Sequence, residues 1–271
     1  MAAATRPPSR NLSRMCAALG VALLASLGIA GTANAVQATN YVALGDSYSS
    51  GVGAGNYGNS GACKRSANAY GQLWANAHSG TKFTFLACSG AKTGDVLNQI
   101  GSMPSNATLV TVTVGGNDAG FTDVITTCTL NNDQTCVNRV NTAKSYVQNT
   151  LPGLLNKVYA AVKAKAPNAK LVVLSYPRFY TVPGSCSVGL SDTKRSAINS
   201  GADTLASVLS ARALAAGAKF VDVRPAFTGH NICSPAGDYL HSLTFPVDES
   251  YHPTVAGQRG GYYAPLSSAI G

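Results

Sequence analysis

The chain has 271 residues, of which 45% are hydrophobic and 11% are charged, and its formal net charge is +9. Its 20 Lys and Arg residues are scattered without a basic run, which argues against a nucleic-acid-binding protein. Beyond the N-terminal segment, no stretch is apolar enough to predict a membrane span. Length and composition therefore indicate a folded domain with a sizeable core.

The first 35 residues have the features of a secretory signal peptide. Three arginines precede an apolar run, Met15 to Ala30, and Ala33-Asn34-Ala35 has the small-x-small form of a cleavage site. The alternative is a retained membrane anchor, for which the run is short. We predict a signal peptide at 1–35 and a secreted mature chain, 36–271, that folds as a single domain. Its net charge of about +6 would favour contact with anionic lipid or polymer surfaces.

Strand-like and helix-like segments alternate along the mature chain. In chain order, the pattern predicts a strand at 41–44, a helix at 70–77, a strand at 83–87, a helix at 93–100, a strand at 109–114, a helical stretch at 137–164, a strand at 171–174, a helix at 191–216, a strand at 220–223 and a last helix from Thr254. Pro152 is expected to kink or split the long helical stretch. Because continuously apolar strands separated by helices require a parallel sheet covered on both faces, we predict an α/β fold with three α/β/α layers.

Six cysteines remain in the predicted mature chain. They are Cys63, Cys88, Cys128, Cys136, Cys186 and Cys233. An even number in an exported chain predicts three disulfides, and the short spacing between Cys128 and Cys136 favours a local pair. The spacing leaves the remaining connectivity open. A zinc site is the alternative, but the sequence has no C-x-x-C motif and no histidine at ligand spacing, so we predict no metal.

Residues that could form a catalytic site follow three of the predicted strands. Ser47 comes three residues after the first strand, Gly90 follows the second, and Asn117 follows the third. Such residues are usually parts of turns, but together they would supply a nucleophile and donors for an oxyanion at the ligand-binding edge of a parallel sheet. His252 stands before Pro253 in an aperiodic loop with two carboxylates close by, and it is the candidate base.

Three other features have structural interpretations. Asp118 is expected to cap the following helix. Gly53 to Gly58 matches G-x-G-x-x-G but opens no helix directly, so we interpret it as a loop beside Ser47 rather than a dinucleotide site. Tyr239, Phe245 and Tyr251 either line a substrate groove near His252 or pack under the loop that carries it.

Four blocks in order resemble the SGNH (GDSL-type) hydrolases, most closely the secreted actinobacterial lipases, esterases and phospholipases. The blocks are Gly45-Asp46-Ser47, Gly90, Gly116-Asn117-Asp118 and His252-Pro253. The resemblance implies a flavodoxin-like, five-stranded parallel sheet, with Ser47 as nucleophile and His252 as base. It implies an oxyanion hole made by the N–H groups of Ser47 and Gly90 and the side chain of Asn117, and a reaction without a cofactor.

The same resemblance implies that the cysteines pair sequentially. The implied disulfides are Cys63 with Cys88, Cys128 with Cys136, and Cys186 with Cys233.

The chain departs from the family pattern at two points. Tyr48 stands where the family name has leucine, and we assign no mechanistic weight to that change. The family's acid is an aspartate three residues before the histidine, where this chain has Glu249, with Asp248 one step earlier. Three groups could therefore orient His252: the backbone carbonyl of Ser250, which we place first, then Glu249, then Asp248.

The expected function is that of a secreted serine ester hydrolase that cleaves acyl esters of lipids, as a lipase, an esterase or a phospholipase of the A type. We expect lipid or small ester substrates, transient contact with a lipid surface, no nucleic-acid partner and a monomeric state. Two alternatives are a carbohydrate acetyl-esterase, for which an exposed face rich in Trp or Tyr would be expected, and a non-catalytic secreted binding module.

Overall fold

The computed structural model describes residues 1–5, 39–184, 186 and 189–271. The predicted signal peptide, apart from its first five residues, lies outside the described residues, so its cleavage after Ala35 stays a prediction. The remaining part of the chain, Ala38–Gly271, is one compact unit. Among the described helices, none has both the length and the apolar character needed to cross a lipid bilayer.

A five-stranded sheet forms the centre of the compact unit. Its strands are β1 Asn40–Gly45, β2 Lys82–Phe85, β3 Leu109–Thr113, β4 Lys170–Leu174 and β5 Lys219–Val221. All neighbouring strands are parallel and the order is β2-β1-β3-β4-β5, the flavodoxin-like order. Every residue of β3 is buried, as expected for a central strand covered on both faces. The predicted parallel sheet is confirmed.

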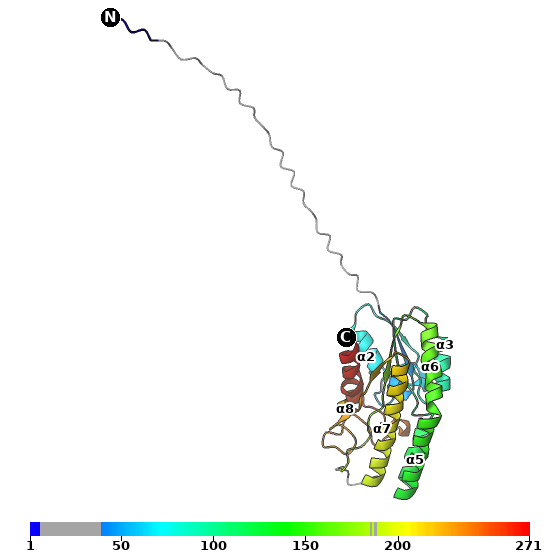
Figure 1. Ribbon diagram of the computed structural model, residues 1–271. Helices are drawn as coiled ribbons and strands as arrows, with labels where there is room; N and C mark the ends of the chain where they lie inside the picture. The colour runs from blue at the N-terminus through cyan, green and yellow to red at the C-terminus, as the bar shows by residue number, and fades with distance from the viewer. Residues whose placement is uncertain (6–38, 185, 187–188) are drawn as a thin grey trace. The chain divides into compact units, whose positions relative to one another are not determined.

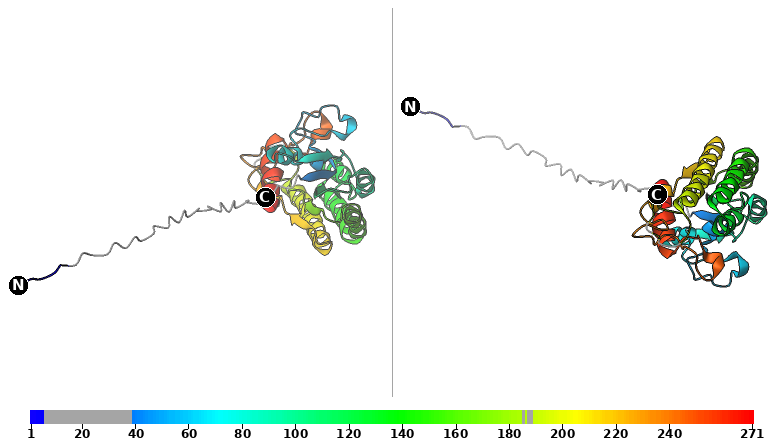
Figure 2. Two further views of the ribbon diagram at one scale, coloured as in Figure 1. Left: turned by 90° about the horizontal axis from the view of Figure 1, so that it is seen from above. Right: turned by 90° about the horizontal axis from the view of Figure 1, so that it is seen from below.

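Helices cover both faces of this sheet (Figures 1 and 2). One layer contains α3 Thr93–Gly101, α4 Phe121–Leu130, α5 Asp133–Asn149, α6 Leu151–Lys165 and α7 Asp192–Ala215. The other contains α2 Tyr70–Ala77, α8 Arg224–Phe227, the π-helix η3 Gly257–Tyr263 and α9 Ala264–Ile270. The three-layer α/β/α fold is therefore confirmed.

The helical stretch predicted at 137–164 is two helices, α5 and α6. Pro152 lies in the first turn of α6, where its missing N–H costs no helical hydrogen bond, so it marks a helix start. The sequence pattern missed α4 altogether, because its sequence, FTDVITTCTL, is rich in Thr, Val and Ile residues that have low helix propensity. Packing of α4 against α5 and the disulfide between these helices compensate for that weak propensity.

Three disulfides link the six cysteines. The pairs are Cys63–Cys88, Cys128–Cys136 and Cys186–Cys233. They are the pairs that the family resemblance implies. A zinc site built from these cysteines is thereby excluded, because each sulfur is already bonded to another.

Candidate active site

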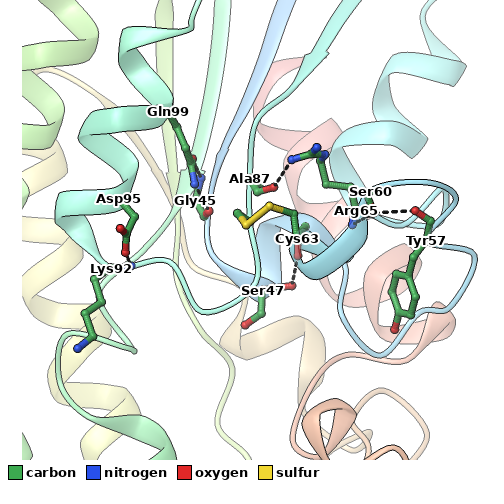
Figure 3. Close-up of a disulfide and its surroundings, with 12 residues drawn as sticks. Gly45, Ser47, Tyr57, Ser60, Cys63, Arg65, Ala87, Lys92, Asp95 and Gln99 are labelled. Atoms are coloured by element: carbon green, nitrogen blue, oxygen red, sulfur yellow. Dashed lines mark hydrogen bonds between the residues drawn. A yellow bond between two sulfur atoms is a disulfide. The ribbon is translucent and has the colours of Figure 1, made fainter.

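Ser47 is held at the carboxyl end of β1. Gly45, the last residue of β1, has φ +122°, and a side chain there would collide with the backbone of Thr113 on β3, so only glycine fits. Both backbone groups of Gly45 pair with the Gln99 side chain: its N–H donates to Oε1 at 2.8 Å, and its carbonyl accepts from Nε2 at 2.9 Å (Figure 3). The chain is thus fixed just before Ser47, which begins the short helix α1, Ser47–Ser50.

Asp46 connects the turn that carries Ser47 to the neighbouring strand ends. Its carboxyl group accepts the Tyr48 N–H at 3.0 Å, which caps α1, and also accepts the Tyr176 hydroxyl. The Tyr176 oxygen in turn accepts the Gly116 N–H at 3.2 Å, next to Asn117. Burial raises the pKa of Asp46 to about 7, against the hydrogen bonds from Tyr176 and Tyr48, so Asp46 is not a permanent anion. We interpret Asp46 as a structural residue.

His252 lies within hydrogen-bond distance of Ser47. Its Nε2 is 2.7 Å from Ser47 Oγ, and its Nδ1 is 3.1 Å from the Ser250 carbonyl oxygen. Because a carbonyl oxygen can only accept, Nδ1 carries the proton and the bare Nε2 accepts the Ser47 O–H. Desolvation lowers the pKa of His252 to about 4, although the bond to Ser250 acts in the opposite direction. The imidazole is therefore neutral at pH 7, as a base must be.

The two carboxylates near His252 have other partners. Glu249 Oε1 accepts the Tyr57 hydroxyl at 2.7 Å and lies 4.0 Å from Lys64 Nζ. Asp248 forms an ion pair with Lys64. Neither carboxylate hydrogen-bonds to the imidazole of His252, whose Nδ1 partner is the Ser250 carbonyl. The geometry therefore corresponds to the first of the three alternatives, a carbonyl-oriented histidine.

Gly90 follows β2 in a turn that a disulfide links to the segment after Ser47. It has φ +76°, a conformation that glycine adopts at little cost. The Cys63–Cys88 disulfide fastens this turn to the segment after α1 (Figure 3). The Ser89 N–H also donates to the Cys63 carbonyl at 3.1 Å. Within the described part of the chain, the N–H groups of Gly90 and Ser47 have no hydrogen-bond acceptor. Both are therefore available to an oxyanion.

Asn117 follows β3, and its amide is fixed by one hydrogen bond. Its Nδ2 donates to the Ala91 carbonyl at 3.0 Å, which identifies the nitrogen side of the amide and leaves its second N–H for a ligand. The next residue, Asp118, accepts the backbone N–H and the hydroxyl of Thr93, at 3.0 and 2.6 Å. Asp118 thus caps α3, and the prediction that it caps the following helix is wrong.

Ser47, Gly90, Asn117 and His252 all line one pocket of about 680 Å³, a size typical of small-molecule sites. From there the pocket extends to helices α4, α5 and α7, where most of the lining side chains are apolar. These residues include Val124, Ile125, Val140, Val147, Ile198, Gly201, Ala202 and Leu205. The pocket thus combines hydrogen-bonding groups at one end with an apolar interior.

The three aromatic residues considered for an acyl groove have different environments. Tyr251 lines the pocket, whereas Tyr239 stacks on His230 at 4.0 Å between ring centroids and packs against Phe227. Phe245 is 89% exposed. Sequence reasoning missed Tyr176, although its place just after β4 is the signal that identified Gly90 and Asn117.

A model of the GDSL-like Lipase/Acylhydrolase family matches residues 43–259, a span that includes Ser47 and His252. The chain belongs to this family. It is 51% identical to a lipase of Streptomyces rimosus over 96% of this chain and 98% of the relative. It is 53% identical to Lipase 1 of Streptomyces coelicolor over 95% of this chain and 96% of the relative. As a member of this family, the chain is an ester hydrolase, which excludes the non-catalytic binding module.

Two solved structures of the family are similar to the compact unit. One is the extracellular lipase of Streptomyces rimosus, with a TM-score of 0.84 and 54% identity. The other is phospholipase A1 of Streptomyces albidoflavus, with a TM-score of 0.82 and 55% identity. Each comparison covers 86% of this chain and all of the other.

Proposed function

We propose that the chain hydrolyses acyl esters of lipids through a covalent acyl-enzyme on Ser47. The observation that carries the proposal is the 2.7 Å contact between Ser47 Oγ and the unprotonated Nε2 of His252, because a serine hydroxyl needs an adjacent base to become a nucleophile. The Ser250 carbonyl keeps the proton on Nδ1, so Nε2 stays free to accept. In this site a backbone carbonyl takes the orienting part that a carboxylate has in serine triads.

The reaction then follows in two proton-balanced steps. His252 takes the proton of Ser47 as Oγ bonds to the ester carbonyl carbon, and the resulting oxyanion accepts from the N–H groups of Ser47 and Gly90 and from the Asn117 amide. Collapse breaks the bond to the alcohol, which leaves with the proton held by His252. A water that loses its proton to His252 attacks the acyl-enzyme, and the acid is released as Ser47 is reprotonated.

The apolar interior of the pocket supports an acyl chain as the part of the substrate that enters it. Helices α4, α5 and α7 contribute aliphatic side chains there, and these bury alkyl groups favourably. The relatives named lipase and phospholipase A1 lead us to propose both neutral lipids and phospholipids as substrates. A carbohydrate ester is less well supported, because Trp74, the chain's one tryptophan, is only 5% exposed and packs on Tyr41.

Exposed apolar side chains at the pocket mouth support transient contact with a lipid surface. Leu130, Leu243 and Val247 line the pocket and are 76%, 68% and 57% exposed. Phe245, between the last two in the chain, is more exposed still. Apolar groups gathered at the entrance would reach a lipid layer before the ester does.

We also propose that the protein acts after secretion. The predicted signal peptide and three disulfides support this, because disulfides persist in oxidising compartments outside the cytosol.

Labelling with an active-site phosphonate tests the proposed nucleophile. We expect one phosphonyl adduct on Ser47, located by peptide mass spectrometry, and no adduct and no esterase activity in the Ser47→Ala variant. Ser50→Ala is the matched control, since Ser50 lies on the same short helix, does not line the pocket, and directs its hydroxyl to the Ser47 carbonyl. An adduct on another residue, or an active Ser47→Ala variant, would refute the proposal.

A further inference from the structure

Tyr48, the residue directly after Ser47, contacts the loop that carries His252. Its hydroxyl donates to the Tyr251 carbonyl at 2.5 Å, and its ring centroid is 5.3 Å from that of His252. Tyr48 is 3% exposed, so neither contact is made at the protein surface. Leucine, the residue of the family name at this position, could not donate this hydrogen bond. The sequence-based interpretation, which assigned no mechanistic weight to tyrosine at this position, missed this contact.

The segment that Tyr48 holds has an unfavourable backbone conformation. Tyr251 has φ +64°, which is uncommon for a residue other than glycine and persists where surrounding contacts impose it. On one side, His241 holds the segment: its carbonyl accepts the Tyr251 N–H at 3.1 Å, and its N–H donates to the His252 carbonyl at 3.0 Å. The Tyr48 hydroxyl contacts the peptide between Tyr251 and His252 from the side of the nucleophile.

Tyr48 is itself fixed relative to Ser47. Both belong to α1, whose first turn is capped by Asp46, and the Tyr48 carbonyl accepts the Gln258 amide at 3.1 Å. Burial raises the pKa of the Tyr48 hydroxyl well above its usual value, so the group remains a donor at any working pH. One rigid turn therefore carries the attacking hydroxyl and a second hydroxyl that reaches the base loop.

We propose that Tyr48 is a positioning residue that sets His252 against Ser47 by holding the Tyr251 carbonyl. The inference rests on the proposed function of Ser47 and His252. The imidazole is oriented by a backbone carbonyl, so its orientation depends on how firmly residues 250–252 are held. A carboxylate side chain could follow small movements of the imidazole, whereas the Ser250 carbonyl moves only with the backbone. Tyr48 restrains that backbone.

The test compares Tyr48→Phe, which removes only the hydroxyl, with Tyr48→Leu, which installs the family residue. The assay is p-nitrophenyl butyrate hydrolysis, with active sites counted by phosphonate titration. We expect Tyr48→Phe to lower kcat per active site about 10-fold to 100-fold, because a slightly misplaced base loses part of the 10²–10⁴ that general-base catalysis supplies. KM of Tyr48→Phe should change little, since the ring that lines the pocket is kept and the hydroxyl that is removed donates to the Tyr251 carbonyl. Tyr48→Leu should lose at least as much.

Tyr159→Phe is the matched control. Tyr159 is a fully buried tyrosine whose hydroxyl has no partner among the described residues, and it does not line the pocket, so kcat should be unchanged. Two results would overturn the inference: a kcat per titrated site of Tyr48→Phe within about twofold of wild type, or full activity of Tyr48→Leu. In both cases general-base catalysis by His252 would not depend on the Tyr48 hydroxyl. Failure of the proposed function is a separate result, because it would appear as an unlabelled Ser47 in the wild type.

Discussion

Ser47 and His252, the proposed nucleophile and base, are positioned in two different ways. Ser47, Gly90 and Asn117 each follow a strand of the parallel sheet, whose register places them at one edge. His252 lies in a long segment between α8 and η3. Contacts of Tyr48, Tyr57 and Lys64 with the residues just before His252 hold this segment. The sheet therefore places Ser47 and the proposed oxyanion donors, whereas contacts of individual side chains place the segment that carries His252.

The largest effect should come from removing the base itself. We expect His252→Ala to lower kcat about 10²–10⁴-fold, the usual contribution of a general base, without a large change in the thermal midpoint. His230→Ala is the control, because His230 pairs with Asp238 at 2.8 Å and does not line the pocket. Steady-state kinetics on a soluble ester measures both. Equal losses in the two variants would mean that His252 has no special role.

The next largest effect is expected for Asn117, a proposed oxyanion donor that follows a strand of the sheet. Asn117→Ala should lower kcat about 10²–10³-fold, the cost of one oxyanion donor, with a smaller effect on KM. Asn131→Ala serves as the control, since that exposed amide donates only to the Thr127 carbonyl one turn earlier. If kcat survives in Asn117→Ala, the oxyanion is held by the backbone N–H groups alone.

The acid limit of activity should report the protonation of His252. Because His252 must be neutral to accept a proton and its pKa is lowered to about 4, kcat/KM should fall only as the pH drops through about 4. At pH 5, the neutral fraction of an imidazole with the ordinary pKa of about 6.5 would be roughly thirtyfold smaller than that of an imidazole with a pKa of about 4. A pH profile of kcat/KM on an uncharged ester distinguishes these two pKa values. Return of full activity at pH 7 after exposure to each acidic pH shows that the loss is not caused by irreversible unfolding. Because Asp46, with its pKa raised to about 7, titrates in the same range, an acid limb near 6.5 that persists in Asp46→Asn would show a solvated histidine.

The smallest effect is expected for the carboxylate at the family's acid position. Glu249→Gln keeps an acceptor for the Tyr57 hydroxyl and should cost about 1 kcal/mol at most, a factor of about five in kcat. Ser250 contacts the imidazole through its backbone carbonyl, and its hydroxyl pairs with the Thr244 backbone, so a side-chain variant of Ser250 would not test the same point. A hundredfold loss of kcat in Glu249→Gln would indicate that the Glu249 carboxylate orients His252, and it would contradict the interpretation that the Ser250 carbonyl does so.

The strand ends could be predicted from the sequence because parallel strands with continuous apolar runs bring their carboxyl ends to one edge, whatever the loops do. Ser47, Gly90 and Asn117 follow from that rule, and the disulfide pairs follow from the family resemblance. The parts that could not be predicted depend on contacts between distant residues. Tyr48 and Tyr251 are far apart in the chain, and no periodicity indicates that a hydroxyl of one meets the carbonyl of the other. The partners of Glu249 and Asp248, Tyr57 and Lys64, are equally remote in sequence.

Gly201, in the middle of α7, affects both the stability of that helix and the space in the pocket. Glycine inside a helix is less stable than alanine by roughly 0.5–1 kcal/mol, so α7 is weaker here than it could be. An added methyl group would lie 3.6 Å from Val140, an ordinary contact, and would occupy space in the apolar part of the pocket. A Gly201→Ala substitution is therefore expected to stabilise α7 and to leave less room for the acyl chain that we propose enters the pocket, without changing the hydrogen-bonded groups around Ser47.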